Sequence, residues 1–388
     1  MRIKDTIYLD HQASTPVDER VLEVMLPFYS DSFGNPHSAD HILGWQANQA
    51  VESAAAQVAS LLDCGNDEVI FTSGATEANN HAVLGASIVA QGSERNRIIV
   101  SAIEHKCVLA AAQAAHEIFG MKVEYAPVDR CGRIKLDWLS EKLDSDVLLV
   151  SAIGVNNEVG TIQDIQTIAE MSGKVGALVH SDCAQAPLAT DMGEVASHVD
   201  MLSLSGHKIY GPKGIGALFI RRSFQNRISP IIFGGGQQNN LRSGTVPTHL
   251  AVGFGQAVEI LNDDISPKHD RLRLLRDRFV DGLKQAEMDV ALITPTDVPT
   301  HPANANVRFI GINAQDILQS IQPRVAASTG SACTSGIPES SHVLRVMGFT
   351  EQEASECVRF SMGRHTTEVD VEQAVAIITE SIRSLYNG

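Results

Sequence analysis

The feature that most constrains this chain is a series of short, continuously apolar runs that alternate with helix-like stretches between residues 50 and 225. Such runs are typical of parallel strands, because helices cover both faces of a parallel sheet. The intervening stretches include Glu104–Phe119 and Asp164–Ser172, so the pattern predicts an α/β fold with a mostly parallel central sheet flanked by helices. The runs are Glu68–Thr72, Arg97–Ser101, Asp146–Ile153, Ala177–Asp182, Asp200–Ser203 and Gly216–Ile220.

The sequence changes character after Gly253. A helical stretch near residues 251–286 carries a charged run at 268–278, a Pro- and Thr-rich segment covers 294–302, and 369–385 has the pattern of an amphipathic helix. The chain has 388 residues, which is enough for about two domains of roughly 150 residues each. We therefore expect a large domain over residues 15–260 and a smaller α+β domain formed by residues 261–388 with 1–14.

Composition excludes several classes of function. The net charge of −16 argues against direct binding of nucleic acid, which needs clustered Lys and Arg. No run of about 18 apolar residues predicts a membrane span, and the first residues contain no signal-peptide core. Six cysteines lie far apart without a C-x-x-C pair, so neither a structural metal site nor a disulfide framework is expected. Reduced thiols favour a cytoplasmic protein.

Polar residues follow the expected strands at the edge where parallel sheets bind ligands. The turn Ser73–Glu77 is either a helix cap or an anion cradle made of backbone N–H groups. Three further residues also have an ordinary structural interpretation when each is taken alone. His105 could be a structural histidine, Asp182 a helix cap and Lys208 a solvated surface charge.

Taken together, these residues favour one ligand. A phosphate cradle, a flat imidazole, an Asp, a Gln and a Lys would meet in one crevice, and pyridoxal 5′-phosphate uses all five. His105 can stack on its ring, Asp182 can hold its pyridine nitrogen protonated, and Lys208 can bond to its aldehyde.

At this point the chain resembles the cysteine desulfurases of the class V aminotransferase superfamily, in the long-loop group that includes the iron–sulfur-assembly and nitrogen-fixation desulfurases. The resemblance implies the fold type I architecture of transferases that depend on pyridoxal phosphate. The segments that carry it are Leu9–Val17, Gly34–Ser38, Phe71–Asn79, Glu104–Lys106, Val155–Gly160, Ser205–Gly216, Arg242–Pro247, Ser328–Ser335 and Val358–Gly363.

The resemblance also implies roles for individual residues. Lys208 matches the lysine that bonds the cofactor and moves the substrate proton, and His105 matches the stacking residue and acid/base. Arg359 matches the clamp for the substrate carboxylate, which suits the planar guanidinium fork. The other expected cofactor residues are Ala75, Thr76, Asn157, Asp182, Gln185, Ser205, His207 and Thr245, and the other expected substrate residues are Asn157, Asn35 and Arg242.

Cys333 matches the cysteine that takes the sulfur. It lies in a segment of small, hydroxyl and glycine residues, 328–336, which is typical of an exposed loop. The expected reaction converts L-cysteine to L-alanine and leaves a persulfide on Cys333 for an acceptor protein. That acceptor could serve iron–sulfur assembly, tRNA thiolation or DNA phosphorothioation. Because Thr245 matches a residue that reaches the neighbouring subunit's cofactor, a homodimer is expected.

Three other interpretations stay open from the sequence. One is a selenocysteine lyase or another class V enzyme, in which activity need not depend on Cys333. A second is a non-catalytic scaffold, against which the intact Lys208, Cys333 and Arg359 argue. A third, a nicotinamide-binding protein, lacks the G-x-G-x-x-G turn after the first strand.

Overall fold

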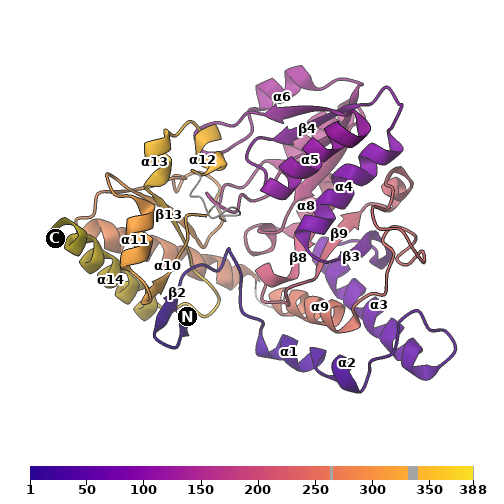
Figure 1. Ribbon diagram of the computed structural model, residues 1–388, viewed down its shortest axis with the longest axis horizontal. Coiled ribbons are helices and arrows are strands. Elements are labelled where there is room, and N and C mark those ends of the chain that lie inside the picture. The colour runs from indigo at the N-terminus through magenta and orange to yellow at the C-terminus, as the bar shows by residue number, and fades with distance from the viewer. Residues whose placement is uncertain (263–264, 331–339, 388) are drawn as a thin grey trace.

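A seven-stranded sheet with helices packed around it forms the larger part of the computed structural model, which describes residues 1–262, 265–330 and 340–387 (Figure 1). The strand order is β3-β9-β8-β7-β6-β4-β5. All neighbouring strands pair in parallel except those that flank β9. The strands are β3 (Val69–Thr72), β4 (Arg97–Ser101), β5 (Lys122–Ala126), β6 (Val147–Ser151), β7 (Leu178–Asp182), β8 (Met201–Ser205) and β9 (Gly216–Ile220).

The expected α/β fold with a mostly parallel sheet is confirmed, with two differences in detail. β9 runs antiparallel to β3 and β8, because the short segment between Ser205 and Gly216 cannot hold the helix that a parallel crossover needs. β5 was not expected, because it is an edge strand whose first four residues are partly or fully exposed and so lack the continuous apolar pattern.

Two apolar clusters pack against the two faces of this sheet. One includes Phe71, Ile99 and Leu202, and the other includes Ile70, Ile98 and Leu218, so adjacent residues of one strand enter different clusters. Helices cover both faces, which explains why the strands are apolar throughout. The helices of this part are α1 (Glu19–Met25), α2 (Pro27–Ser30), α3 (Ile42–Leu62), α4 (Ala75–Val89), α5 (Lys106–Phe119), α6 (Leu136–Lys142), α7 (Ile165–Lys174), α8 (Met192–His198) and α9 (Thr248–Asn262).

The C-terminal elements form a second group, on the left of Figure 1, with a separate apolar cluster. Ile7 and Leu9 belong to that cluster, together with residues between 272 and 382. The strands are β1 (Arg2–Ile3), β2 (Thr6–Tyr8), β10 (Val290–Leu292), β11 (Asn304–Phe309), β12 (Val325–Ala326) and β13 (Cys357–Ser361). The helices are α10 (Ile265–Gln285), α11 (Ala314–Ser320), α12 (His342–Val346), α13 (Glu351–Ser355) and α14 (Glu368–Asn387).

The second cluster supports, as a proposal, a smaller domain made of residues 261–388 with 1–14. Val343, Leu344 and Met347 instead pack into the core of the large sheet, so α12 ties the two parts together. Within the described ranges, no helix is both long and apolar enough to cross a lipid bilayer.

Acidification should destabilise the protein through histidines that are buried in the neutral form. His180 lies in β7, where its two ring nitrogens contact the Ser151 and Ser203 hydroxyls at 2.8 and 3.0 Å. Burial lowers its pKa to about 4, below the value of about 6.5 expected in the unfolded chain. The unfolded state therefore binds more protons between those two values, and stability falls as pH drops from 6.5 to 4, by up to about 3 kcal/mol for this group.

We predict that His180→Gln weakens the fall in melting temperature between pH 7 and pH 5. The exposed His37 offers a matched control, since His37→Gln should leave the pH dependence as in the unmodified protein. An unchanged pH dependence in His180→Gln would contradict this assignment.

Candidate functional site

One large cavity, of about 750 Å³, lies at the carboxyl ends of the parallel strands. Its size is in the range of cofactor pockets. Side chains that follow β3, β4, β6, β7 and β8 line it, since parallel strands deliver their carboxyl ends to one edge of the sheet. The residues named from the sequence that line it are Ala75, Thr76, His105, Asn157, Asp182, Gln185, Ser205, His207, Lys208 and Arg359.

The N-terminus of α4 forms one wall of this cavity. Gly74 precedes the helix with a φ of 146°, a conformation that favours glycine. Apart from its chain neighbours, no atom in the described part of the chain lies within 4 Å of the position that a Cβ would take there. Among the described residues, no side chain caps this end of α4, so its backbone N–H groups can bind an anion. Ser205 and His207 also line this cavity. Burial lowers the pKa of His207 to about 4, so its ring is neutral at neutral pH.

Asp182 ends β7 and is 4% exposed. The Asn79 side-chain amide donates to its Oδ2 at 2.7 Å, and the backbone N–H of Ala184 donates to its Oδ1 at 3.0 Å. These bonds hold the carboxylate in place without a cation. A buried carboxylate on a cavity wall can accept a hydrogen bond from a protonated ring nitrogen.

Glu104 lies close to Asp182 and is fully buried. Its Oε1 accepts a hydrogen bond from the backbone N–H of Ile153. Burial, reinforced by the negative charge of Asp182, raises the pKa of Glu104 well above its usual value. Burial and the neighbouring carboxylate both favour the protonated form of the Glu104 side chain.

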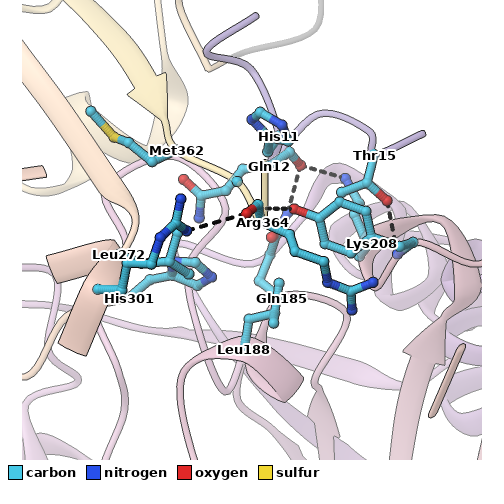
Figure 2. Close-up of a pocket in the computed structure, with 13 residues that line it drawn as sticks. His11, Gln12, Thr15, Gln185, Leu188, Lys208, Leu272, His301, Met362 and Arg364 are labelled. Carbon is cyan, nitrogen blue, oxygen red and sulfur yellow. Dashed lines mark hydrogen bonds between the residues drawn. The ribbon is translucent and has the colours of Figure 1, made fainter. Parts of the chain in front are cut away.

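Lys208 follows β8, and its amine donates to the backbone oxygen of Gln12 at 2.7 Å (Figure 2). It also donates to the backbone oxygen of Ala13 at 3.0 Å. Burial, reinforced by the charge of Arg359, lowers the pKa of this amine to about 8. A second cavity of about 160 Å³ lies beside the first, and Gln12, Gln185 and Lys208 line both. Lys208 thus has open space on two sides, which leaves its side chain room to change position.

Arg359, on β13, comes from the C-terminal group of elements and is 3% exposed. Its Nη1 donates to the backbone oxygen of Asn157 at 2.6 Å, and its Nη2 donates to Asp10 Oδ1 at 2.8 Å and to Ser328 Oγ at 3.0 Å. These contacts fix the plane of the guanidinium at the cavity, where it can meet a carboxylate with two parallel hydrogen bonds.

Three residues named from the sequence do not line this cavity in the described part of the chain. Asn35 is exposed, and its side chain accepts from the backbone N–H of His37. Arg242 forms an ion pair with Glu77 at 2.9 Å, and Thr245 is exposed. Cys333 lies outside the described residues.

Sequence reasoning missed three residues that shape the site, namely Asp10, Gln12 and Asn79. Each lies inside a segment that carried the resemblance, but none follows a strand of the large sheet. Asp10 and Gln12 act through contacts with residues 349 and 196 positions away, and no local pattern predicts such pairs. Asn79 is one turn into α4 from Ala75, so the spacing of four residues was its only signal.

The chain matches one protein family along nearly its whole length. The family model described as Aminotransferase class-V matches residues 7–374. The cysteine desulfurase IscS of Rickettsia akari (strain Hartford) is 42% identical over 381 residues, which cover 98% of this chain and 92% of that protein.

Solved structures share the fold of this chain. A NifS-like protein has a TM-score of 0.90 and 34% identity, and the match covers 99% of this chain and 100% of that one. A structure described as SspA in complex with cysteine has a TM-score of 0.80 and 34% identity, with 93% and 99% of the two chains covered. The chain therefore belongs to the class V aminotransferase family.

Proposed function

We infer that this protein is a pyridoxal-phosphate-dependent cysteine desulfurase. The observation that carries the proposal is the meeting, in one cavity, of the Lys208 amine with its lowered pKa, the buried Asp182 carboxylate and the Arg359 guanidinium. The relatives named as cysteine desulfurases cover nearly the whole chain, and one similar structure is described as a complex with cysteine. L-cysteine is the proposed substrate and L-alanine the proposed product.

The residues present fit the cofactor that this family uses. The N-terminus of α4, with Thr76, Ser205 and His207, would hold the phosphate, and Asp182 would hold the ring nitrogen. Gln185 would contact the phenolic oxygen, and His105 would lie against the ring. When bound, the cofactor supplies an electron sink for the charge that develops at the substrate Cα.

Side chains of the protein bind the substrate, move its proton and accept its sulfur. Arg359 binds the substrate carboxylate and so orients the Cα–H bond, and Asn157 lies beside it. Lys208 takes and returns the proton, which its lowered pKa allows near neutral pH. The Cys333 thiolate attacks the substrate sulfur, the carbon fragment keeps the electrons of the broken C–S bond and gains a proton, and Cys333 keeps the sulfur as a persulfide.

We further propose a cytoplasmic homodimer that passes the sulfur to an acceptor protein for iron–sulfur assembly, tRNA thiolation or DNA phosphorothioation. Large apolar side chains gather in and beside α1, α2 and the start of α3, including Leu26, Phe33 and Trp45, each more than half exposed. An exposed apolar group of this size favours a protein–protein interface. A second subunit would also explain why Thr245 and Asn35 lie outside the cavity of one chain.

Replacing the proposed nucleophile tests the reaction. Cys333→Ser should abolish the persulfide that forms on the protein in L-cysteine while leaving the bound cofactor's absorbance intact, because serine does not accept sulfur. Peptide mass spectrometry locates the added sulfur atom, and Cys131→Ser serves as the control. Alanine release from L-cysteine at an unchanged rate in Cys333→Ser would contradict this role, and release only from selenocysteine would favour a selenocysteine lyase.

Arg359→Lys tests substrate binding. Loss of the two-pronged hydrogen bond should lower kcat/KM for L-cysteine by about 10- to 100-fold, mostly through KM, since one charge-assisted bond contributes about 1.5–3 kcal/mol. The exposed Arg222, which pairs with Asp67 on the surface, provides the control Arg222→Lys. An unchanged KM in Arg359→Lys would place the carboxylate elsewhere.

The Lys208 amine should titrate with a midpoint near pH 8. In cofactor-free protein, an amine-directed acylating reagent should label Lys208 at a rate that rises through that pH, because only the neutral amine reacts. Surface lysines should gain reactivity only nearer their usual value of about 10.4. Peptide mass spectrometry separates the positions, and a Lys208 profile that follows the surface lysines would contradict the lowered pKa.

A further inference from the structure

A second thiol lies beside the proposed reaction centre and is unused by the mechanism above. Cys107, the second residue of α5, lines the large cavity together with His105. Its Sγ lies 2.9 Å from His105 Nδ1, and the Asn79 side-chain amide donates to the same Sγ at 3.2 Å. Since Asn79 also donates to Asp182, a continuous chain of contacts joins Asp182, Asn79, Cys107 and His105.

The direction of the His105–Cys107 hydrogen bond follows from three observations. First, His105 caps α5 by accepting the backbone N–H of Cys107 at its Nδ1, at 3.3 Å, so Nδ1 carries a lone pair. Second, Sγ already accepts from the Asn79 amide, and the Thr76 hydroxyl is a further partner that can donate to the sulfur, so the thiol hydrogen can point to His105 Nδ1. Third, burial and the charge of Asp182 raise the pKa of the Cys107 thiol to about 11, so its hydrogen is present at neutral pH.

We propose that Cys107 is a positioning residue that donates its S–H to His105 Nδ1 and so fixes the imidazole as the tautomer with its hydrogen on Nε2. A neutral imidazole has one N–H, so occupation of the Nδ1 lone pair by two donors leaves Nε2 as the donor. His105 therefore meets the substrate as a hydrogen-bond donor and not as a base.

This inference rests on the proposed function for its catalytic consequence, but the tautomer can be measured without any reaction. Holoenzyme labelled with ¹⁵N-histidine, free of substrate, is examined by NMR at neutral pH, and His105→Gln identifies the His105 signals. The expected result is an unprotonated Nδ1 and a protonated Nε2. A hydrogen on Nδ1 overturns the proposal.

Variants at position 107 separate the role of the thiol hydrogen from that of the backbone. Cys107→Ala keeps the backbone N–H donor to Nδ1 but loses the thiol donor, so it should lower the share of the Nε2–H tautomer. Cys107→Ser should restore that share, because the hydroxyl can donate in the same direction. Cys131→Ala, which removes a thiol outside both cavities, should change nothing. Identical tautomer populations in Cys107→Ala, Cys107→Ser and the unmodified protein would overturn the proposal.

Kinetics gives a second readout. Loss of one hydrogen bond of ordinary strength should lower kcat for alanine formation about fivefold in Cys107→Ala, with KM for L-cysteine unchanged and with recovery in Cys107→Ser. An unmodified protein that forms no alanine would refute the proposed function and leave the NMR result to decide the tautomer. Equal kcat in all the position-107 variants would refute the catalytic consequence of the tautomer.

Discussion

The site depends on the partial removal of one amine from water. A lysine amine in water has a pKa of about 10.4, but the surrounding chain buries Lys208 and places Arg359 nearby, so that its pKa falls to about 8. The amine donates hydrogen bonds to the backbone oxygens of Gln12 and Ala13, which lie in the N-terminal segment. A contact between the start of the chain and the segment after β8 thus holds this amine in place.

The fold supplies this contact through the arrangement of its two groups of elements. The large sheet delivers Thr76, Asp182 and Lys208 to one edge, because the strands that precede them run in the same direction. Arg359 comes to the same cavity from β13, and its ion pair with Asp10 joins the C-terminal elements to the N-terminal segment. The cavity therefore needs both groups of elements in place.

Much of this could be predicted from the sequence, because buried parallel strands are apolar without interruption and ligand-binding residues follow them directly. The runs at 97–101 and 177–182 match β4 and β7 closely. β5 was missed because an edge strand is half solvated, and the direction of β9 is decided by the length of its connection instead of its composition. The partners of Lys208 and Arg359 were missed because a contact across hundreds of residues leaves no local pattern.

The central claim, that Lys208 is the amine that holds the cofactor, has a direct test. Borohydride reduction of the holoenzyme converts the bond between a lysine and the cofactor aldehyde into a stable one, and peptide mass mapping then locates the modified residue. We expect the modification on Lys208 alone. A cofactor attached to Lys213, which also lines the cavity, or to no lysine, would contradict this account.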